Sequence, residues 1–353
     1  MPTITVFPNQ DEIKQYVPAI HRNMSGNTLL PFIQDAENHE LIPYIGKDLY
    51  EDLLVTISTE NTALLPYVKS VVAWFAYYRA LPTLRTVMAD MGLQQQTDRE
   101  GTSTPANEEQ YTTALWNAYR TGYDKLEVLL WNFLVPNAAD YPLWTAWDGS
   151  AITSDLFLFS PKMFQEYHPL QTPGALETWL KLRPLMRRIE LYYIKPVLCD
   201  DLFNELKTQV AADTVTAANA IILQFVRDAV AAYTVVDAAA KLNLQLTARG
   251  AKTRVSTDSR YARTTATDRD YEHLYTNENS DIARAMATLN QYLYANKADY
   301  PLWEASPCNP DNSTCLDPCN PDSNYSARTC NACHNFPCSC RVITASKKGI
   351  IGI

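Results

Sequence analysis

The sequence predicts an all-α protein built from two tandem copies of a small helical bundle, with an extended irregular C-terminal tail. Two observations predict this fold class. Asp140-Tyr-Pro-Leu-Trp144 recurs as Asp299-Tyr-Pro-Leu-Trp303, and neighbouring segments recur in the same order. Apolar residues return mostly every three or four positions, as they do on one face of an amphipathic helix. We therefore divide the chain into a first copy at 1–150, a second copy at 151–305 and a Cys-rich tail at 306–353.

The duplication extends beyond the pentapeptide. Residues 196–206 match 43–53, and residues 225–233 match 67–75. Gly250 then falls opposite Gly92 at the same offset. Because nearly every element returns in sequence order, we expect both copies to share one helical fold.

The first copy contains five predicted helices, at residues 11–17, 33–41, 47–57, 67–91 and 111–134. Segment 67–91 is apolar on more than one face, which is typical of a buried central helix. Gly92 suits the position just after its end, and the polar segment 93–109 reads as an exposed loop. We expect residues 37–40 to form a solvated helix face.

The second copy repeats this order and ends with a predicted helix at 281–294. Its loop at 251–270 is basic, and Lys252, Arg254, Arg260 and Arg263 are candidates to face nucleic acid or an acidic partner. A solvated loop is the commoner state for such a segment, and interspersed aspartates weaken the charge. The connection at 148–173 carries aromatic residues, which predict that it packs on the body of the protein.

The repeated Asp-Tyr-Pro-Leu-Trp turn has two interpretations. Trp144 and Trp303 could be interaction anchors, since tryptophan is favoured at interfaces. Proline also fixes the backbone, while leucine and tryptophan supply apolar area at a corner between a helix and a loop. Because the same turn closes both copies, we favour core packing.

Composition excludes some function classes. A net charge of −9 argues against a general nucleic-acid binder. No apolar run approaches the roughly 18 residues that span a bilayer, and the start lacks the pattern of a secretory signal. We expect a protein that folds in a cytoplasm and does not enter a membrane.

Catalytic motifs are missing from the sequence. It contains no G-x-S-x-G, no P-loop and no G-x-G-x-x-G, and its five histidines show no i, i+4 pair. We therefore predict that the protein is not an enzyme and needs no organic cofactor.

Cysteines crowd the tail, where seven follow residue 307, while Cys199 stands alone in the body. Cys330-Asn-Ala-Cys333-His334 matches the haem-attachment pattern, but the lack of an export signal argues against haem. Zinc held by Cys330, Cys333, Cys338 and Cys340 is an alternative, and free thiols with some pairing are the commoner state. Seven is odd, so disulfides within the tail cannot satisfy all of them.

The extreme C-terminus is apolar and rich in β-branched residues. An extended terminus can add a strand to a neighbouring chain, which is a known mode of recognition. We expect docking on a partner through five side chains: Val342, Ile343, Ile350, Ile351 and Ile353.

Two stretches of the first copy carry a family resemblance. Phe32-Ile-Gln-Asp-Ala-Glu37, followed by Leu41-Ile-Pro-Tyr-Ile-Gly46-Lys-Asp-Leu-Tyr50, resembles the head–tail connector proteins of tailed bacteriophages. Residues 1–305 as a whole resemble an uncharacterised structural family encoded by phages of gut Bacteroidetes. The resemblance implies rings, commonly of twelve subunits, beneath the portal protein, with C-termini that dock on the portal or on neighbouring subunits. This chain departs from the pattern by carrying two copies and a Cys-rich tail.

These observations together predict a virion structural protein. The expected role is a connector ring in the phage neck that bridges the portal and the tail, with DNA passing through its lumen, assembled in the host cytoplasm. The alternative is a zinc-binding regulatory or interaction module that uses the Cys-rich tail.

Overall fold

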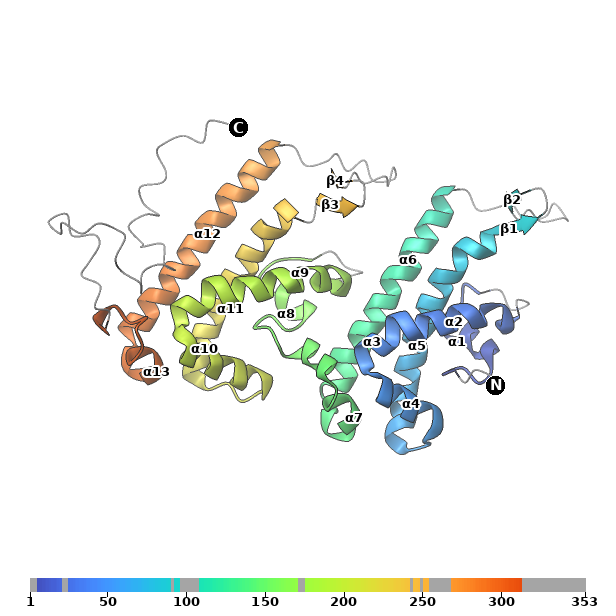
Figure 1. Cartoon of the computed structure of the whole chain (residues 1–353), viewed down its shortest axis with the longest axis horizontal. Coiled ribbons are helices and arrows are strands. Elements are labelled where there is room, and N and C mark those ends of the chain that lie inside the picture. Colours follow the sequence, from blue (N-terminus) through green and yellow to red (C-terminus); the bar gives the residue numbers. More distant parts are fainter. Residues whose placement is uncertain are drawn as a thin grey trace. The chain divides into compact units, whose positions relative to one another are not determined.

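The computed structural model describes residues 5–20, 25–89, 92–95, 108–170, 175–241, 244–247, 250–253 and 268–312 (Figure 1). It confirms an all-α, two-copy bundle. Packing divides the chain into two compact units. The first unit holds the described residues up to Asp155 together with those of Phe159–Leu182, and the second holds Leu156–Leu158 and the described residues from Arg183 onward. Our sequence limits at 150 and 305 mark the repeat, whereas this division marks packing.

The first unit is built around two long helices, α5 (Thr59–Arg85) and α6 (Glu108–Glu127), which lie side by side (Figure 1). The elements before α5 are η1 (Gln10–Glu12), α1 (Ile13–Tyr16), η2 (Gly26–Leu29), α2 (Leu30–Ala36), π-helical η3 (Glu37–Leu41), α3 (Ile42–Ile45) and α4 (Lys47–Val55). Those after α6 are π-helical η4 (Val128–Leu134), η5 (Ala138–Asp140), α7 (Pro142–Thr145), η6 (Asp148–Thr153) and α8 (Pro161–Gln165).

Helix α5 is the core of the first unit, as its sequence predicts. Val68, Val71, Val72 and Phe75 are fully buried along it. It begins where Ser58 Oγ accepts a hydrogen bond from the Asn61 N–H at 3.0 Å, because a serine before the first turn satisfies an otherwise unpaired amide.

The second unit repeats the plan with α11 (Ala217–Lys241) beside α12 (Asp268–Ala295) (Figure 1). The other elements are α9 (Ala175–Ile189), which crosses from the first unit at residue 182, π-helical η7 (Glu190–Ile194), α10 (Lys195–Ala211), η8 (Lys297–Asp299), α13 (Pro301–Glu304) and η9 (Pro310–Asn312). The connection between copies packs as predicted, because Phe157, Leu158 and Phe164 are fully buried.

Two antiparallel hairpins correct the sequence prediction. β1 (Thr86–Ala89) pairs with β2 (Gly92–Gln95), and β3 (Leu244–Thr247) pairs with β4 (Gly250–Thr253). The predicted helix at 67–91 therefore ends at Arg85, and Gly92 begins a strand. The β-branched Thr86 and Val87 suit a strand, and only two residues connect β1 to β2, which is typical of a tight hairpin. The last helix also begins earlier than predicted, at Asp268.

A buried glutamate holds an extended segment at the start of each copy. Glu37 Oε1 accepts a hydrogen bond from the Val6 N–H at 2.8 Å, and Glu190 Oε1 accepts one from the Phe157 N–H at 2.6 Å. Each glutamate is only 2% exposed. The prediction of a solvated face is thus wrong for Glu37, because a buried backbone amide needs an acceptor inside the protein.

One helix is long and apolar enough to contradict the expectation that no segment reaches membrane-spanning length. Residues Ala217–Ala238 are long and apolar enough to cross a membrane by length and composition, and half of that segment is buried. The core helix of a bundle meets the same criterion, and this segment is the core of α11.

Candidate functional site

The repeated turn is fixed in the first copy by two hydrogen bonds to the backbone of earlier elements. The Tyr141 hydroxyl donates to the Glu60 carbonyl at 2.7 Å, at the start of α5. Trp144 Nε1 donates to the Tyr44 carbonyl at 3.4 Å, in α3. The turn therefore ties the end of the copy to its beginning.

The second copy repeats both anchors. The Tyr300 hydroxyl donates to the Ala218 carbonyl at 2.7 Å, and Trp303 Nε1 donates to the Val197 carbonyl at 3.0 Å. Both tryptophans of the repeat are buried, which confirms the core-packing interpretation. The leucines differ from the prediction, since Leu143 and Leu302 are 41% and 39% exposed.

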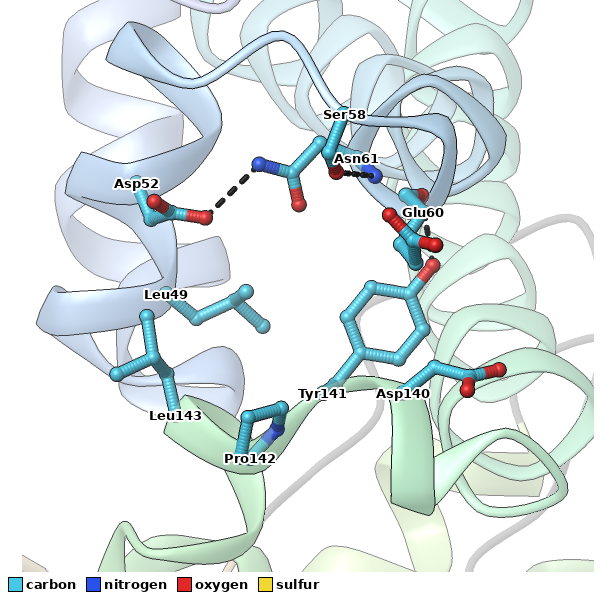
Figure 2. Close-up of a pocket in the computed structure, with 9 residues that line it drawn as sticks. All are labelled: Leu49, Asp52, Ser58, Glu60, Asn61, Asp140, Tyr141, Pro142 and Leu143. Atoms are coloured by element: carbon cyan, nitrogen blue, oxygen red, sulfur yellow. Dashed lines mark hydrogen bonds between the residues drawn. The ribbon is translucent and has the colours of Figure 1, made fainter.

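A pocket lies beside the turn of the first copy (Figure 2). Its volume is about 210 Å³, and it lies between α4, the start of α5 and the turn; its lining includes Leu49, Asp52, Ser58, Asn61, Tyr141, Pro142 and Leu143. Pockets for drug-sized ligands occupy roughly 300–1,000 Å³. This pocket therefore suits one side chain of a partner better than a free small molecule.

The connection from α4 to α5 is tightly closed at the pocket. The Asp52 carboxylate accepts a hydrogen bond from Asn61 Nδ2 at 2.8 Å (Figure 2). It also accepts one from Thr56 Oγ1 at 2.6 Å, and these two bonds lower the pKa of Asp52. This closure leaves two apolar side chains outside, with Val55 79% exposed and Ile57 98% exposed. We call these two residues and Leu143, which lines the pocket, the first-copy patch.

The second copy keeps the closure but not the patch. Asn219 Nδ2 donates to Glu205 Oε1 at 3.0 Å, which reproduces the bond between Asn61 and Asp52. Eight residues separate the bonded pair in the first copy and thirteen separate it in the second. The extra residues extend α10, and Val210 is buried there.

The second copy exposes a different apolar surface. Leu191, Tyr192 and Tyr193 of η7 are 47%, 69% and 46% exposed, and we call them the second-copy patch. The aligned positions of the first copy hold Asn38-His39-Glu40. Buried Glu190 fixes the inner face of this turn, so the residues that follow it reach solvent. The ring of Tyr193 also stacks on Tyr233 at 4.6 Å.

Both patches were missed by reasoning from the sequence. A signal for the second-copy patch was available in the alignment of the two copies, because Leu-Tyr-Tyr stands where the first copy has Asn-His-Glu in an otherwise repeated element. Apolar side chains exposed in one copy where the other copy has polar ones are candidates for a contact surface.

The site residues predicted from the sequence fall mostly outside the described part of the chain. Lys252 lies in β4, opposite Gln245. Arg254, Arg260, Arg263, the cysteines at 330, 333, 338 and 340, and the terminal Val342, Ile343, Ile350, Ile351 and Ile353 all lie outside the described residues. Within the described ranges, no group of three or more His, Cys, Asp or Glu side chains is placed to hold a metal ion.

Cys199 is linked to Cys308 by a disulfide, with the two Cα atoms 5.9 Å apart. The cysteine that stands alone in the body is therefore paired with the first cysteine of the tail. Six cysteines remain after residue 308. Because six is even, the odd count of seven no longer argues against complete pairing within the rest of the tail.

Comparison with known proteins identifies the repeated unit. Neither the curated proteins nor the solved structures give a match. One family model, described as a family of unknown function (DUF6712), matches twice, at residues 39–153 and 194–313. The two matches cover most of both copies and agree with the repeat found in the sequence. The chain therefore belongs to the DUF6712 family of unknown function and carries two copies of its domain.

Proposed function

We propose that this protein is a virion structural protein, a head–tail connector that forms a ring between the portal and the tail of a phage. One observation carries the proposal: two copies with the same internal anchors expose different apolar patches. Exposed apolar groups gathered at one place mark protein contact sites, and tyrosine is enriched at such interfaces. The resemblance of 32–50 to connector proteins supplies the kind of assembly.

Different patches on equivalent scaffolds favour head-to-tail association. When a chain binds its neighbour through two unlike surfaces, the assembly closes into a ring if the rotation allows it. The first-copy patch offers exposed aliphatic side chains, of which Leu143 lines a pocket, and the second-copy patch offers exposed aromatic side chains. In the proposal, the second-copy patch of one subunit binds the first-copy patch of the next.

Contacts beyond the ring come from segments outside the described residues. The apolar C-terminus with Ile350 and Ile351 is the proposed clamp on the portal or on a neighbouring subunit. The basic residues Arg254, Arg260 and Arg263 are the proposed contacts with DNA passing through the lumen.

Mass photometry of variants in the first-copy patch tests whether this patch takes part in assembly, because it measures the mass of the assembled particles. We expect Val55→Ser combined with Ile57→Ser, and Leu143→Ser alone, to shift rings toward monomers. Leu302→Ser is the matched control, because Leu302 is the repeat equivalent of Leu143, has a similar exposure of 39% and belongs to neither patch as defined above. Equal ring mass for all variants and the wild type would contradict the proposed use of the patch.

A further inference from the structure

A tryptophan ring covers the break between α3 and α4 in the first copy. Gly46 has φ 82° and ψ 153°, a backbone conformation that is essentially restricted to glycine. A Cβ placed on Gly46 would lie 3.0 Å from Trp147 Cγ, and one placed on Gly149 would overlap the same ring. Trp147 therefore lies against two glycines and holds the segment after the repeated turn onto the α3–α4 break.

The second copy replaces all three residues. The alignment places Cys199 at Gly46, Cys308 at Gly149 and Ser306 at Trp147. The backbone agrees with this alignment, since the Ser306 N–H donates to the Trp303 carbonyl just as the Trp147 N–H donates to the Trp144 carbonyl. The disulfide between Cys199 and Cys308 thus joins the two positions that flank the tryptophan ring in the first copy.

Cys199 keeps the glycine conformation of its counterpart. Its φ of 60° and ψ of 167° interrupt α10. A side chain in this region is strained and persists only where the surrounding structure fixes it. The bond to Cys308 is one such constraint on the backbone at Cys199.

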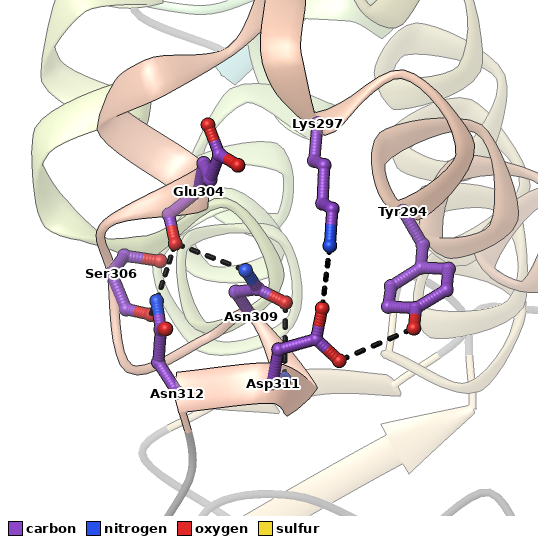
Figure 3. A network of polar contacts seen from close by, with 7 residues as sticks. All are labelled: Tyr294, Lys297, Glu304, Ser306, Asn309, Asp311 and Asn312. Atoms are coloured by element: carbon purple, nitrogen blue, oxygen red, sulfur yellow. Dashed lines mark hydrogen bonds and ion pairs between the residues drawn. The ribbon is translucent and has the colours of Figure 1, made fainter.

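The segment 306–312, which we call the strap, is otherwise held by polar contacts that range from buried to exposed (Figure 3). Asp311 accepts hydrogen bonds from Lys297 Nζ at 2.6 Å and from the Tyr294 hydroxyl at 3.2 Å. Asn309 Nδ2 donates to the Glu304 carbonyl at 3.0 Å. The Lys297 and Asp311 side chains are 38% and 45% exposed, and ion pairs so exposed to solvent stabilise little.

We propose that the Cys199–Cys308 disulfide is a redox-operated lock that holds the strap, and with it the start of the Cys-rich tail, on the second copy. In the oxidised protein the strap is fixed covalently at the α10 break. In the reduced protein the strap keeps its polar contacts but loses its covalent attachment, and it detaches more readily. The first copy has no such control, because its clamp is a tryptophan ring.

The chemistry of the lock is a thiol–disulfide exchange. A dithiol reductant gives two electrons and two protons to the S–S bond, which yields the thiols of Cys199 and Cys308, and the reductant itself becomes a disulfide. Disulfides persist outside cells and are rare in a reducing cytoplasm. If the protein is a virion component, the lock closes after release from the host; that timing rests on the proposed function, whereas the lock does not.

Hydrogen–deuterium exchange of the full chain, with and without a dithiol reductant, tests the lock. The amides of Asn309 and Asn312 donate to backbone carbonyls inside the strap. We expect them to exchange at least about tenfold faster after reduction, because local opening governs exchange. Ser150 and Ser154 make the same kind of bonds in the first copy and serve as the internal control, with unchanged exchange.

Two variants separate the lock from the other tail cysteines. Cys308→Ser should exchange as the reduced protein does in both conditions. The triple variant Cys199→Gly, Ser306→Trp, Cys308→Gly installs the clamp of the first copy and should keep the strap protected with or without reductant. Unchanged strap exchange on reduction of the wild type, or peptide mapping that joins Cys199 to another cysteine, would overturn the inference.

Discussion

Glu37 and Glu190 occupy equivalent positions in the two copies, and each accepts a hydrogen bond from the backbone of an extended segment at the start of its copy. Their remaining environments differ. Glu37 is hydrogen bonded to the hydroxyl of Tyr50, whereas Glu190 forms an ion pair with Lys207 at 2.5 Å. The sequence differences between the copies explain why the partners differ: Phe203 stands at the position of Tyr50, and Lys207 stands at the position of Leu54. The two copies keep the glutamate acceptor, but its side-chain partner is a neutral hydroxyl in the first copy and a cation in the second.

Glu37 should make stability depend on pH. Burial raises the pKa of Glu37 from 4.5 to about 7, so the folded protein keeps a proton that the unfolded chain loses. Its contribution is fully present below pH 4.5 and is lost as the pH rises to about 7, which lowers the free energy of unfolding by up to roughly 3 kcal/mol. Urea denaturation at pH 4.5, 6 and 7.5 measures this.

Glu37→Gln isolates that contribution. Burial also raises the pKa of Glu127 to about 7, so the wild type carries two such groups. The amide of the variant still offers an oxygen to the Val6 N–H but does not titrate. We expect a flatter pH dependence for Glu37→Gln than for the wild type, and parallel curves would show that Glu37 does not titrate in this window.

Lys207→Leu should make the second copy resemble the first. The substitution installs the residue found at position 54 and removes the cation beside Glu190. We expect a loss of about 3 kcal/mol at pH 7.5, because the removal of one partner from a largely buried pair leaves its charge uncompensated. Urea denaturation at pH 7.5 measures this loss, and a variant as stable as the wild type would contradict a stabilising role for the ion pair.

Tyr141→Phe and Tyr300→Phe should lower the free energy of unfolding by about the same amount. Each removes one hydrogen bond of 2.7 Å from the repeated turn to the first turns of α5 or α11, and each should lower the free energy of unfolding by about 1 kcal/mol. The sites lie in separate copies, so the double variant should show the sum. Thermal unfolding of the three variants checks this, and a marked inequality would mean that the turn is not anchored equally.

The glycine conformation at position 199 can be tested in the reduced state. In a Cys308→Ser background, Cys199→Gly should be more stable than Cys199→Ala by about 1–3 kcal/mol, because alanine cannot relieve a positive φ. Gly46→Ala should be destabilising for the same reason and because its Cβ would lie against Trp147. Equal stability of the two variants at position 199 would show that the α10 break relaxes without strain.

Much of the fold follows from the sequence because repetition and helical periodicity are local signals. The identity of Asp140–Trp144 with Asp299–Trp303 fixed the length of the repeat, and the spacing of apolar residues located the long helices. The hairpins were missed because β1 continues an apolar helix without a turn residue between them. Burial of Glu37 was missed because its partner Val6 lies 31 residues away.

The candidate site was harder to predict because its features depend on tertiary packing. Val55 and Ile57 have the composition of core residues, and only the closure by Asp52 and Asn61 turns them outward. The partner of Cys199 is 109 residues away and is one of seven cysteines in the tail, so spacing alone could not identify it.

We propose that this protein acts by forming a ring, and mass photometry of the wild-type chain with a phage portal protein tests the proposal most directly. We expect a closed assembly at a fixed multiple of 39.9 kDa, commonly twelve, that binds the portal as one complex. A protein that remains monomeric, alone and with the portal, at micromolar concentration would contradict it.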